Sequence, residues 1–312
     1  MADAKRLAPT AIRKKRNVLQ KYWELYLLLL FPVAILAVFN YAPMYGIQLA
    51  FRENNIAKGI TGGDWVGLHY FQMFFKTYNW ASIIWNTFYI SLVGLLISFP
   101  FPIILAILMN EIQARRFKKV VQTITYAPHF ISTVVIVGML MMFMDPRAGV
   151  INKLLEIFGF KAVNFMSQKS AFVWIYTFSG VWQSAGFSSI IYLSALTGVD
   201  PQLQEAAAID GADRLRRIWH INLPAILPTI SILLILSLSG LMSVGFEKIF
   251  LMQNPTNLSV SEVISTLVYK QGMEQANYSY ATAVGLMNTV VNFLLLLFFN
   301  TIARLTKQAS WF

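Results

Sequence analysis

The residues of this sequence that could do chemistry are few and stand far apart. The three histidines are His69, His129 and His220, no H-E-x-x-H pattern occurs, and cysteine is absent. Neither a zinc site nor a thiol nucleophile is therefore expected. No Gly-Lys dipeptide occurs, so the chain lacks the P-loop that cradles nucleotide phosphates. We predict a non-catalytic protein that binds no metal and no cofactor of its own.

The longest polar interlude between two apolar segments reads DPQLQEAAAIDGADRLRRIWHINLP, residues 200–224. Asp200 is a good N-cap, and Pro201 suits the first helical turn, where its missing N–H costs nothing. Residues 202–210 read as a helix that Gly211 can end in a left-handed conformation, and residues 212–219 can form a second short helix. We interpret this connection as a docking element for a partner protein, able to transmit motion to the flanking segments.

The composition indicates a membrane protein. Hydrophobic residues make up 57% of the chain and charged residues only 12%, about half the charged share of soluble domains, which is about 25%. The net charge of +11 would suggest nucleic acid in a soluble protein. In a chain this apolar, the basic residues instead indicate how the chain is oriented in the membrane. We therefore expect membrane lipid as a partner and no nucleic acid.

Six charge-free runs are each long enough to cross a hydrocarbon core, which takes about 20 helical residues. A barrel would show alternating segments of about ten residues instead, so we predict an all-α integral membrane protein with six transmembrane helices. The runs are Leu25–Phe51, Thr77–Asn110, Val120–Met144, Ser170–Val199, Ile218–Phe246 and Gln275–Ala303.

The distribution of Lys and Arg predicts the orientation. With both termini inside, the inner segments carry 16 of these residues and the longer outer segments carry 9, as the positive-inside rule requires. We therefore expect a basic cytoplasmic segment at residues 1–21, a six-helix membrane domain at 22–303 and a cytoplasmic tail at 304–312. The stretch at 200–224 then lies in the cytoplasm.

The predicted outer segments carry weaker signals. Aromatic residues at Asp64–Tyr78 predict a short interfacial helix, apolar spacing at Gly149–Phe160 predicts another, and Gln253–Tyr280 reads as a turn-rich surface. Glu24 and Glu247 come nearest to the membrane interior, but each sits at the end of a run. We expect no ionisable group at mid-depth, which argues against a proton-coupled carrier.

The polar stretch resembles the EAA loop of type I binding-protein-dependent ABC importer permeases. That motif is E-A-A, three residues, G, nine residues, I, one residue, L-P, and every fixed position matches: Glu205, Ala206, Ala207, Gly211, Ile221, Leu223 and Pro224. FNYAPMYGIQLAFRE, INKLLEIFG and SEVISTLVYKQGMEQANYSYATAVGL resemble the oligosaccharide branch of the family, whose permeases are linked to a sugar-binding lipoprotein.

The resemblance implies a subunit of a larger machine in the cytoplasmic, or inner, cell membrane. Such a permease pairs with a second and usually different permease, and each EAA helix docks on one subunit of a cytoplasmic ATPase dimer that binds ATP and Mg. An extracytoplasmic solute-binding protein delivers the oligosaccharide. By position, Glu205 contacts the ATPase, and Gly211 supplies the turn.

The substrate pathway is expected near mid-membrane, between the two permeases. The helices on either side of the EAA loop carry polar and aromatic side chains that suit a sugar, although buried Gln and Ser can instead bond a neighbouring helix. The same type of permease for a non-sugar solute and a stand-alone facilitator remain alternatives. The pathway residues expected from the sequence are Gln183, Ser184, Phe187, Ser237, Ser239 and Ser243.

Overall fold

The computed structural model describes residues 22–55, 59–60 and 62–305. Helices make up its regular structure, and the described residues form no β-strand beyond an isolated bridge between Arg52 and Trp65. The chain divides into two compact units, Met1–Gln48 and Leu49–Phe312, which are described separately. The predicted segment at 1–21 and nearly all of the tail at 304–312 lie outside the described residues.

The first unit is a single apolar helical run. It comprises α2 (Trp23–Leu36), the π-helical turn η1 (Ala37–Tyr41) and most of η2 (Ala42–Phe51). Pro32 lies inside α2, and its missing N–H is tolerated in a membrane helix where local adjustments satisfy the freed carbonyl groups. This run coincides with the first predicted membrane segment, Leu25–Phe51.

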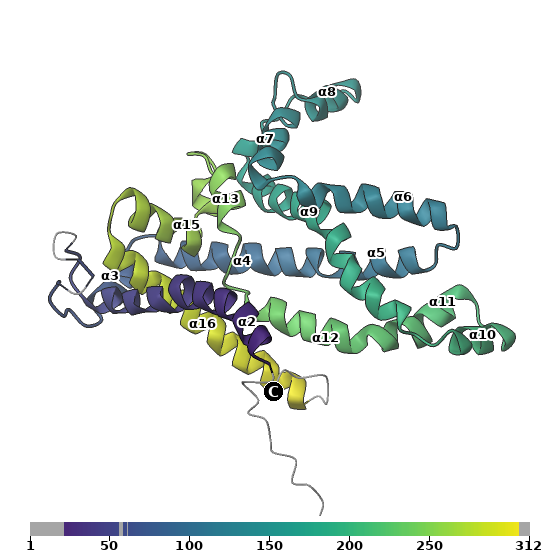
Figure 1. Cartoon of the computed structure of the whole chain (residues 1–312). Helices are drawn as coiled ribbons and strands as arrows, with labels where there is room; N and C mark the ends of the chain where they lie inside the picture. Colours follow the sequence, from purple (N-terminus) through teal and green to yellow (C-terminus); the bar gives the residue numbers. More distant parts are fainter. Residues whose placement is uncertain (1–21, 56–58, 61, 306–312) are drawn as a thin grey trace, which may run out of the picture. The chain divides into compact units, whose positions relative to one another are not determined.

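The second unit holds all the remaining helices (Figure 1). In chain order they are α3 (His69–Lys76), α4 (Trp80–Ser98), α5 (Pro100–Asn110), α6 (Arg115–Tyr126), η4 (Ala127–Phe130), α7 (Thr133–Phe143), α8 (Val150–Ile157), η5 (Phe165–Ser167), α9 (Lys169–Thr197), α10 (Pro201–Ile209), α11 (Arg214–Arg217), η6 (Ile218–Asn222), α12 (Leu223–Ser239), α13 (Phe246–Met252), α14 (Leu258–Ser261), α15 (Ile264–Tyr269), η7 (Lys270–Glu274) and α16 (Tyr278–Leu305).

Four helices in the described part of the chain are long and apolar enough to cross a membrane. A fifth is added if α6–η4 and α7, which meet at 99°, count as one broken span. The helix α9 fills the fourth predicted run and has 29 residues, but its many Ser, Thr and Gln side chains make it more polar than the others. The four helices are Trp23–Phe51, Trp80–Asn110, Arg214–Ser239 and Tyr278–Leu305.

The long helix α9 is the centre of the second unit. Apolar side chains of α5, α9 and α12 form one buried cluster, including Met109, Leu196 and Ile226. Where α6 crosses α9, Gly186 faces Thr125 so closely that an added Cβ atom would overlap the Thr125 carbonyl group. A glycine here lets the two backbones approach, as small residues do in membrane helix packing.

The short helices predicted in two of the three outer segments are present. The helix α3 lies within Asp64–Tyr78, and α8 lies within Gly149–Phe160. The prediction of a turn-rich surface at Gln253–Tyr280 is wrong, because α14, α15 and η7 lie there and bury Val263 and Ile264 in the core.

The buried amide side chain of Asn257 stabilises this segment. It donates hydrogen bonds to the carbonyl groups of Met166 and Met252, both at 3.0 Å. Its oxygen accepts a hydrogen bond from the hydroxyl group of Ser261 at 3.0 Å. Asn257 and Ser261, two of the polar residues that suggested surface turns, are therefore hydrogen-bonded to each other inside the protein.

Candidate functional site

The helix α10 begins and ends as the sequence predicts. The Asp200 carboxylate accepts a hydrogen bond from the Gln202 backbone N–H at 2.9 Å, and Pro201 occupies the first turn. Gly211 adopts a φ of 78° beyond the last helical residue. Two backbone bonds close the end, from Ala212 N to Ala207 O at 2.8 Å and from Gly211 N to Ala208 O at 3.2 Å. Their pattern is that of a Schellman motif.

The predicted separate helix at 212–219 is not separate. Asp213 caps α11 by accepting a hydrogen bond from the Arg216 backbone N–H at 2.8 Å, and the helix then continues through η6 into α12. Arg214–Ser239 is thus one helix of 26 residues. The π-helical turn comes directly before α12, whose first turn contains Pro224, and such turns accommodate a proline without a break.

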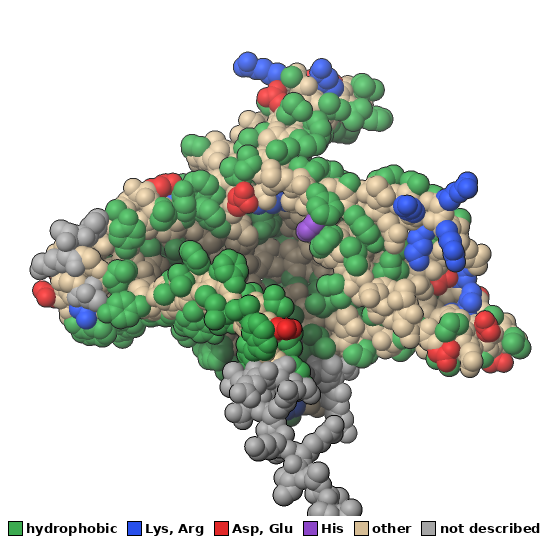
Figure 2. All heavy atoms as spheres, in the orientation of Figure 1, with side chains coloured by type: hydrophobic (Ala, Val, Ile, Leu, Met, Phe, Trp, Pro, Cys, Tyr) green, Lys and Arg blue, Asp and Glu red, His purple; other side chains and the backbone are tan. Residues whose placement is uncertain are grey.

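The surface of α10 and α11 is open. Glu205 and Ala206 are exposed, and three apolar side chains beside them are more than half exposed: Ile209 at 87%, Leu215 at 66% and Trp219 at 64%. Figure 2 shows acidic side chains on this tip and basic side chains gathered on the neighbouring α6. An exposed apolar group rimmed by charge is typical of a surface that contacts another protein.

A chain of polar side chains joins this tip to the helices behind it. Gln204 Nε2 donates a hydrogen bond to Asn222 Oδ1 at 2.5 Å, and Asn222 Nδ2 donates to Glu111 Oε1 at 3.2 Å. Asn222 is only 1% exposed. Sequence reasoning missed these three residues, although a lone Asn between Ile221 and Leu223 at the start of an apolar run was a signal. The chain links α10 to the start of α12 and the end of α5.

A cavity of about 510 Å³ lies among α4, α5, α9, α12 and α13. Its volume falls within the range of about 300–1,000 Å³ that is usual for ligand sites. Four of the six expected pathway residues line it, namely Gln183, Ser184, Ser237 and Ser243. We refer to it as the polar cavity. The helices α9 and α12, which precede and follow the EAA loop, thus both line the polar cavity.

The other two expected pathway residues lie elsewhere. The Phe187 ring stacks on His129, with centroids 3.9 Å apart and planes 1° apart. The Ser239 hydroxyl donates a hydrogen bond to Leu236 O at 2.7 Å in its own helix. Neither residue lines the polar cavity.

One of the expected pathway residues also bonds a neighbouring part of the chain, which was the alternative role for these polar side chains. Gln183 Nε2 donates a hydrogen bond to Ile131 O at 3.3 Å, joining α9 to the bend between η4 and α7. Ser184 and Ser237 donate to carbonyl groups of their own helices, at 2.8 Å each. The Gln183 amide therefore packs helices while it lines the polar cavity.

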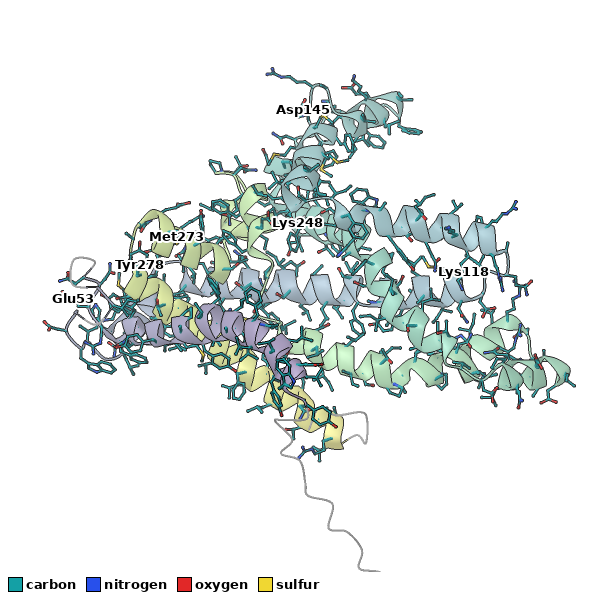
Figure 3. The ribbon with its side chains drawn as sticks, in the orientation of Figure 1. Glu53, Lys118, Asp145, Lys248, Met273 and Tyr278 are labelled. Carbon is teal, nitrogen blue, oxygen red and sulfur yellow. The ribbon has the colours of Figure 1, made fainter. Side chains whose placement is uncertain are left out.

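The sequence analysis does not predict the burial of Lys248 on α13, which is 9% exposed and lines the polar cavity. Figure 3 shows it in the interior of the second unit, well away from Lys118 on α6. Position 248 is just beyond the fifth charge-free run, so the sequence suggested an interfacial charge. The apolar Ile249 and Met252 on the same short helix, both buried, were the signal that α13 packs inside the protein.

Comparison with known proteins identifies a family and several relatives. A family model described as "binding-protein-dependent transport system inner membrane component" matches residues 98–308. The chain is 42% identical over 285 residues to the polygalacturonan/rhamnogalacturonan transport system permease protein YteP of Bacillus subtilis (strain 168). That match covers 91% of this chain and 88% of YteP.

Two solved structures share the fold. One is a bacterial ABC transporter involved in the import of the acidic polysaccharide alginate, with 40% identity, a TM-score of 0.85, and coverage of 92% of this chain and 96% of the other. The second is the bacterial alginate ABC transporter in complex with an alginate pentasaccharide-bound periplasmic protein. It shows 39% identity, a TM-score of 0.85, and coverage of 93% and 97%.

Proposed function

This chain belongs to the family of binding-protein-dependent transport system inner membrane components, and we propose that it is the permease subunit of an ATP-driven importer of oligosaccharides. The proposal rests on its 42% identity, over 91% of its length, to a permease for polygalacturonan and rhamnogalacturonan. The type I ABC importer permease fold, which it shares with the alginate transporter, supports the same assignment.

We infer that α10 docks on a separate cytoplasmic ATPase, which holds the ATP and Mg that this chain does not bind. Glu205 and the apolar Ile209 stand exposed on α10, where a groove could receive them. The Schellman motif at Gly211 and the hydrogen bond to Asn222 fix α10 to the bundle. Movement of the ATPase would therefore pass into α12 and α5, so the chain acts as a non-catalytic transmitter.

The topology that fits this role has six membrane spans and both termini in the cytoplasm of the inner membrane. It counts α9 and the bent α6–α7 pair as spans in addition to the four apolar helices. The helix α6 begins with the basic sequence RRFKK, and this start lies at the same end of the second unit as α10 (Figure 1). That placement agrees with the positive-inside rule.

The partners follow from this arrangement. A second, usually different, permease would complete the pathway and form a heterodimer with this chain. An ATPase dimer would bind below it. An extracytoplasmic solute-binding protein would deliver the sugar, as a periplasmic protein accompanies the alginate transporter.

The polar cavity is the proposed sugar site of this subunit. Sugars need hydroxyl and amide partners, and Gln183, Ser184, Ser237 and Ser243 present such groups along its wall. Phe187 and Ser239 are left out of the site, because Phe187 stacks on His129 and neither residue lines the polar cavity.

The test is reconstitution of the full complex in liposomes. We expect sugar uptake that requires ATP and the binding protein, and we expect Glu205→Ala to abolish it while the permease remains assembled in the membrane. Glu156→Ala is the matched control, because Glu156 is an exposed glutamate on α8. Normal uptake by the Glu205 variant would refute docking through α10. Sugar flux through this chain alone would identify a facilitator instead.

A further inference from the structure

Lys248 is an unusual residue for the interior of a membrane permease. Its ammonium group donates a hydrogen bond to the Tyr176 carbonyl oxygen at 3.2 Å and lies 5.3 Å from the centroid of the Tyr176 ring. Gly180 lies next to it on α9, and an added Cβ atom there would come within 3.6 Å of Nζ. The side chain is therefore held between α13 and α9, with its charge at the polar cavity (Figure 3).

This charge is not compensated within the described chain. Among the described residues Lys270 forms an ion pair with Glu262, whereas Lys248 forms none. An ammonium group has three N–H donors, and the Tyr176 carbonyl accepts one of them. A buried charge without a counter-ion is costly, so the position is suited to an anion that arrives from outside the chain.

The lining of the polar cavity has further polar groups without a hydrogen-bond partner. The hydroxyl groups of Ser91 and Thr177 are buried, line the polar cavity and make no hydrogen bond in the described structure. Thr177 is 2% exposed. A cavity whose lining holds a cation and free hydroxyl groups matches a sugar that carries an acidic group.

The number of charges in the lining favours a singly charged acid over a phosphate ester. The described lining of the polar cavity contains Lys248 and no Arg. One ammonium balances the single charge of a carboxylate, whereas a phosphate ester carries about −1.5 to −2 at neutral pH. A carboxylate also accepts more than one hydrogen bond, so it can bind Lys248 and a hydroxyl group together.

We propose that Lys248 binds the carboxylate of a uronic acid residue in the polar cavity and so selects acidic over neutral oligosaccharides. This assignment rests on the proposed function of the chain as an oligosaccharide permease, and it adds the substrate class. Tyr176 orients the ammonium, while Ser91 and Thr177 bind the sugar hydroxyl groups.

The protonation state of Lys248 agrees with this role. Burial lowers its pKa from 10.5 to about 8, so the group is charged at neutral pH and loses its charge as the pH rises through that value. The other titratable groups that line the polar cavity are Tyr176 and Tyr192 on α9, and Tyr269 on α15 packs against Phe246 of α13. The neighbouring carboxylate on α13, Glu247, is exposed. Acidic sugar uptake should therefore decline above about pH 8.

The experiment compares two substrates in the reconstituted complex, a galacturonate trisaccharide and a neutral galactose trisaccharide. Lys248→Met is expected to lower the ratio of acidic to neutral uptake about tenfold or more, because hydrogen bonds to charged groups are strong. Lys248→Arg should retain the ratio at pH 7 and hold it at pH 9, where the wild-type ratio falls. Lys153→Met, an exposed change on α8, is the matched control.

The outcomes separate the two proposals. If the wild type imports the neutral sugar and not the acidic one, the role of Lys248 is overturned while the permease function stands. If Lys248→Met reduces both sugars equally, or neither, the lysine has a structural role and the assignment is wrong. If the complex imports neither sugar, the proposed function itself fails. Thermal unfolding of each variant in detergent shows whether it is folded.

Discussion

Replacing Gly211 with Ala adds a single methyl group, which acts only through the backbone conformation of this residue. Its φ of 78° lies in the left-handed region, where a Cβ atom costs about 1–2 kcal/mol. No atom lies within 4 Å of the position that this Cβ would occupy, so no steric clash adds to that cost. The population of the closed Schellman turn, relative to open forms of the loop, would then fall by a factor of about 5–30.

The assay is the ratio of sugar imported to ATP hydrolysed by the reconstituted complex. We expect Gly211→Ala to lower this ratio by up to that factor, because α10 must be held firmly to pass motion to α12. Gly211→Asn should lose less, since Asn tolerates the left-handed conformation better than Ala.

Gly198 provides the matched control at the other end of the same connection. Its φ is −83°, and an added Cβ would come within 3.4 Å of Ala195 O, which is ordinary contact. Gly198→Ala should therefore leave the coupling ratio unchanged. An unchanged ratio in Gly211→Ala, or an equal loss in Gly198→Ala, would refute the reasoning.

Three further predictions concern packing and buried polar groups. Gly186→Ala should lower the thermal unfolding midpoint in detergent, because its Cβ would overlap the Thr125 carbonyl, whereas Gly138→Ala should not, since no atom lies within 4 Å of that position. Asn257→Ala should destabilise the fold by about 2–3 kcal/mol, because several buried partners lose their hydrogen bonds, and chemical denaturation would measure this. Asn222→Leu should leave the complex assembled but lower the sugar imported per ATP, since α10 loses its bond to α12. Full coupling in that variant would exclude a role for the network.

The local features of α10 could be predicted from the sequence. Asp200, Pro201 and Gly211 determine the start and end of α10 through their own backbone preferences, and these preferences act within a few residues. The continuity of α11 with α12 could not be read in the same way. The sequence IWHINLP suggests a break before Pro224, but a π-helical turn at 218–222 removes it.

The interior of the second unit depends on tertiary contacts that no local pattern reports. Asn257 and its partners look like a surface turn until Met166, 91 residues earlier, supplies a carbonyl acceptor. Lys248 looks interfacial until Tyr176, 72 residues earlier, covers it. Phe187 looked like a sugar platform, and only the structure shows that His129 occupies its face. Buried polar residues are thus the places where sequence reasoning failed.

The continuity of the helix from Arg214 to Ser239 has a mechanical consequence. A continuous helix of 26 residues that moves as one body is about 39 Å long at 1.5 Å per residue. For a helix of this length, a tilt of about 10° around its midpoint would move each end by about 3 Å, in opposite directions. A push inward at Arg214 would therefore swing Ser237 outward, and the wall of the polar cavity would open by leverage, with no change in any helix between them.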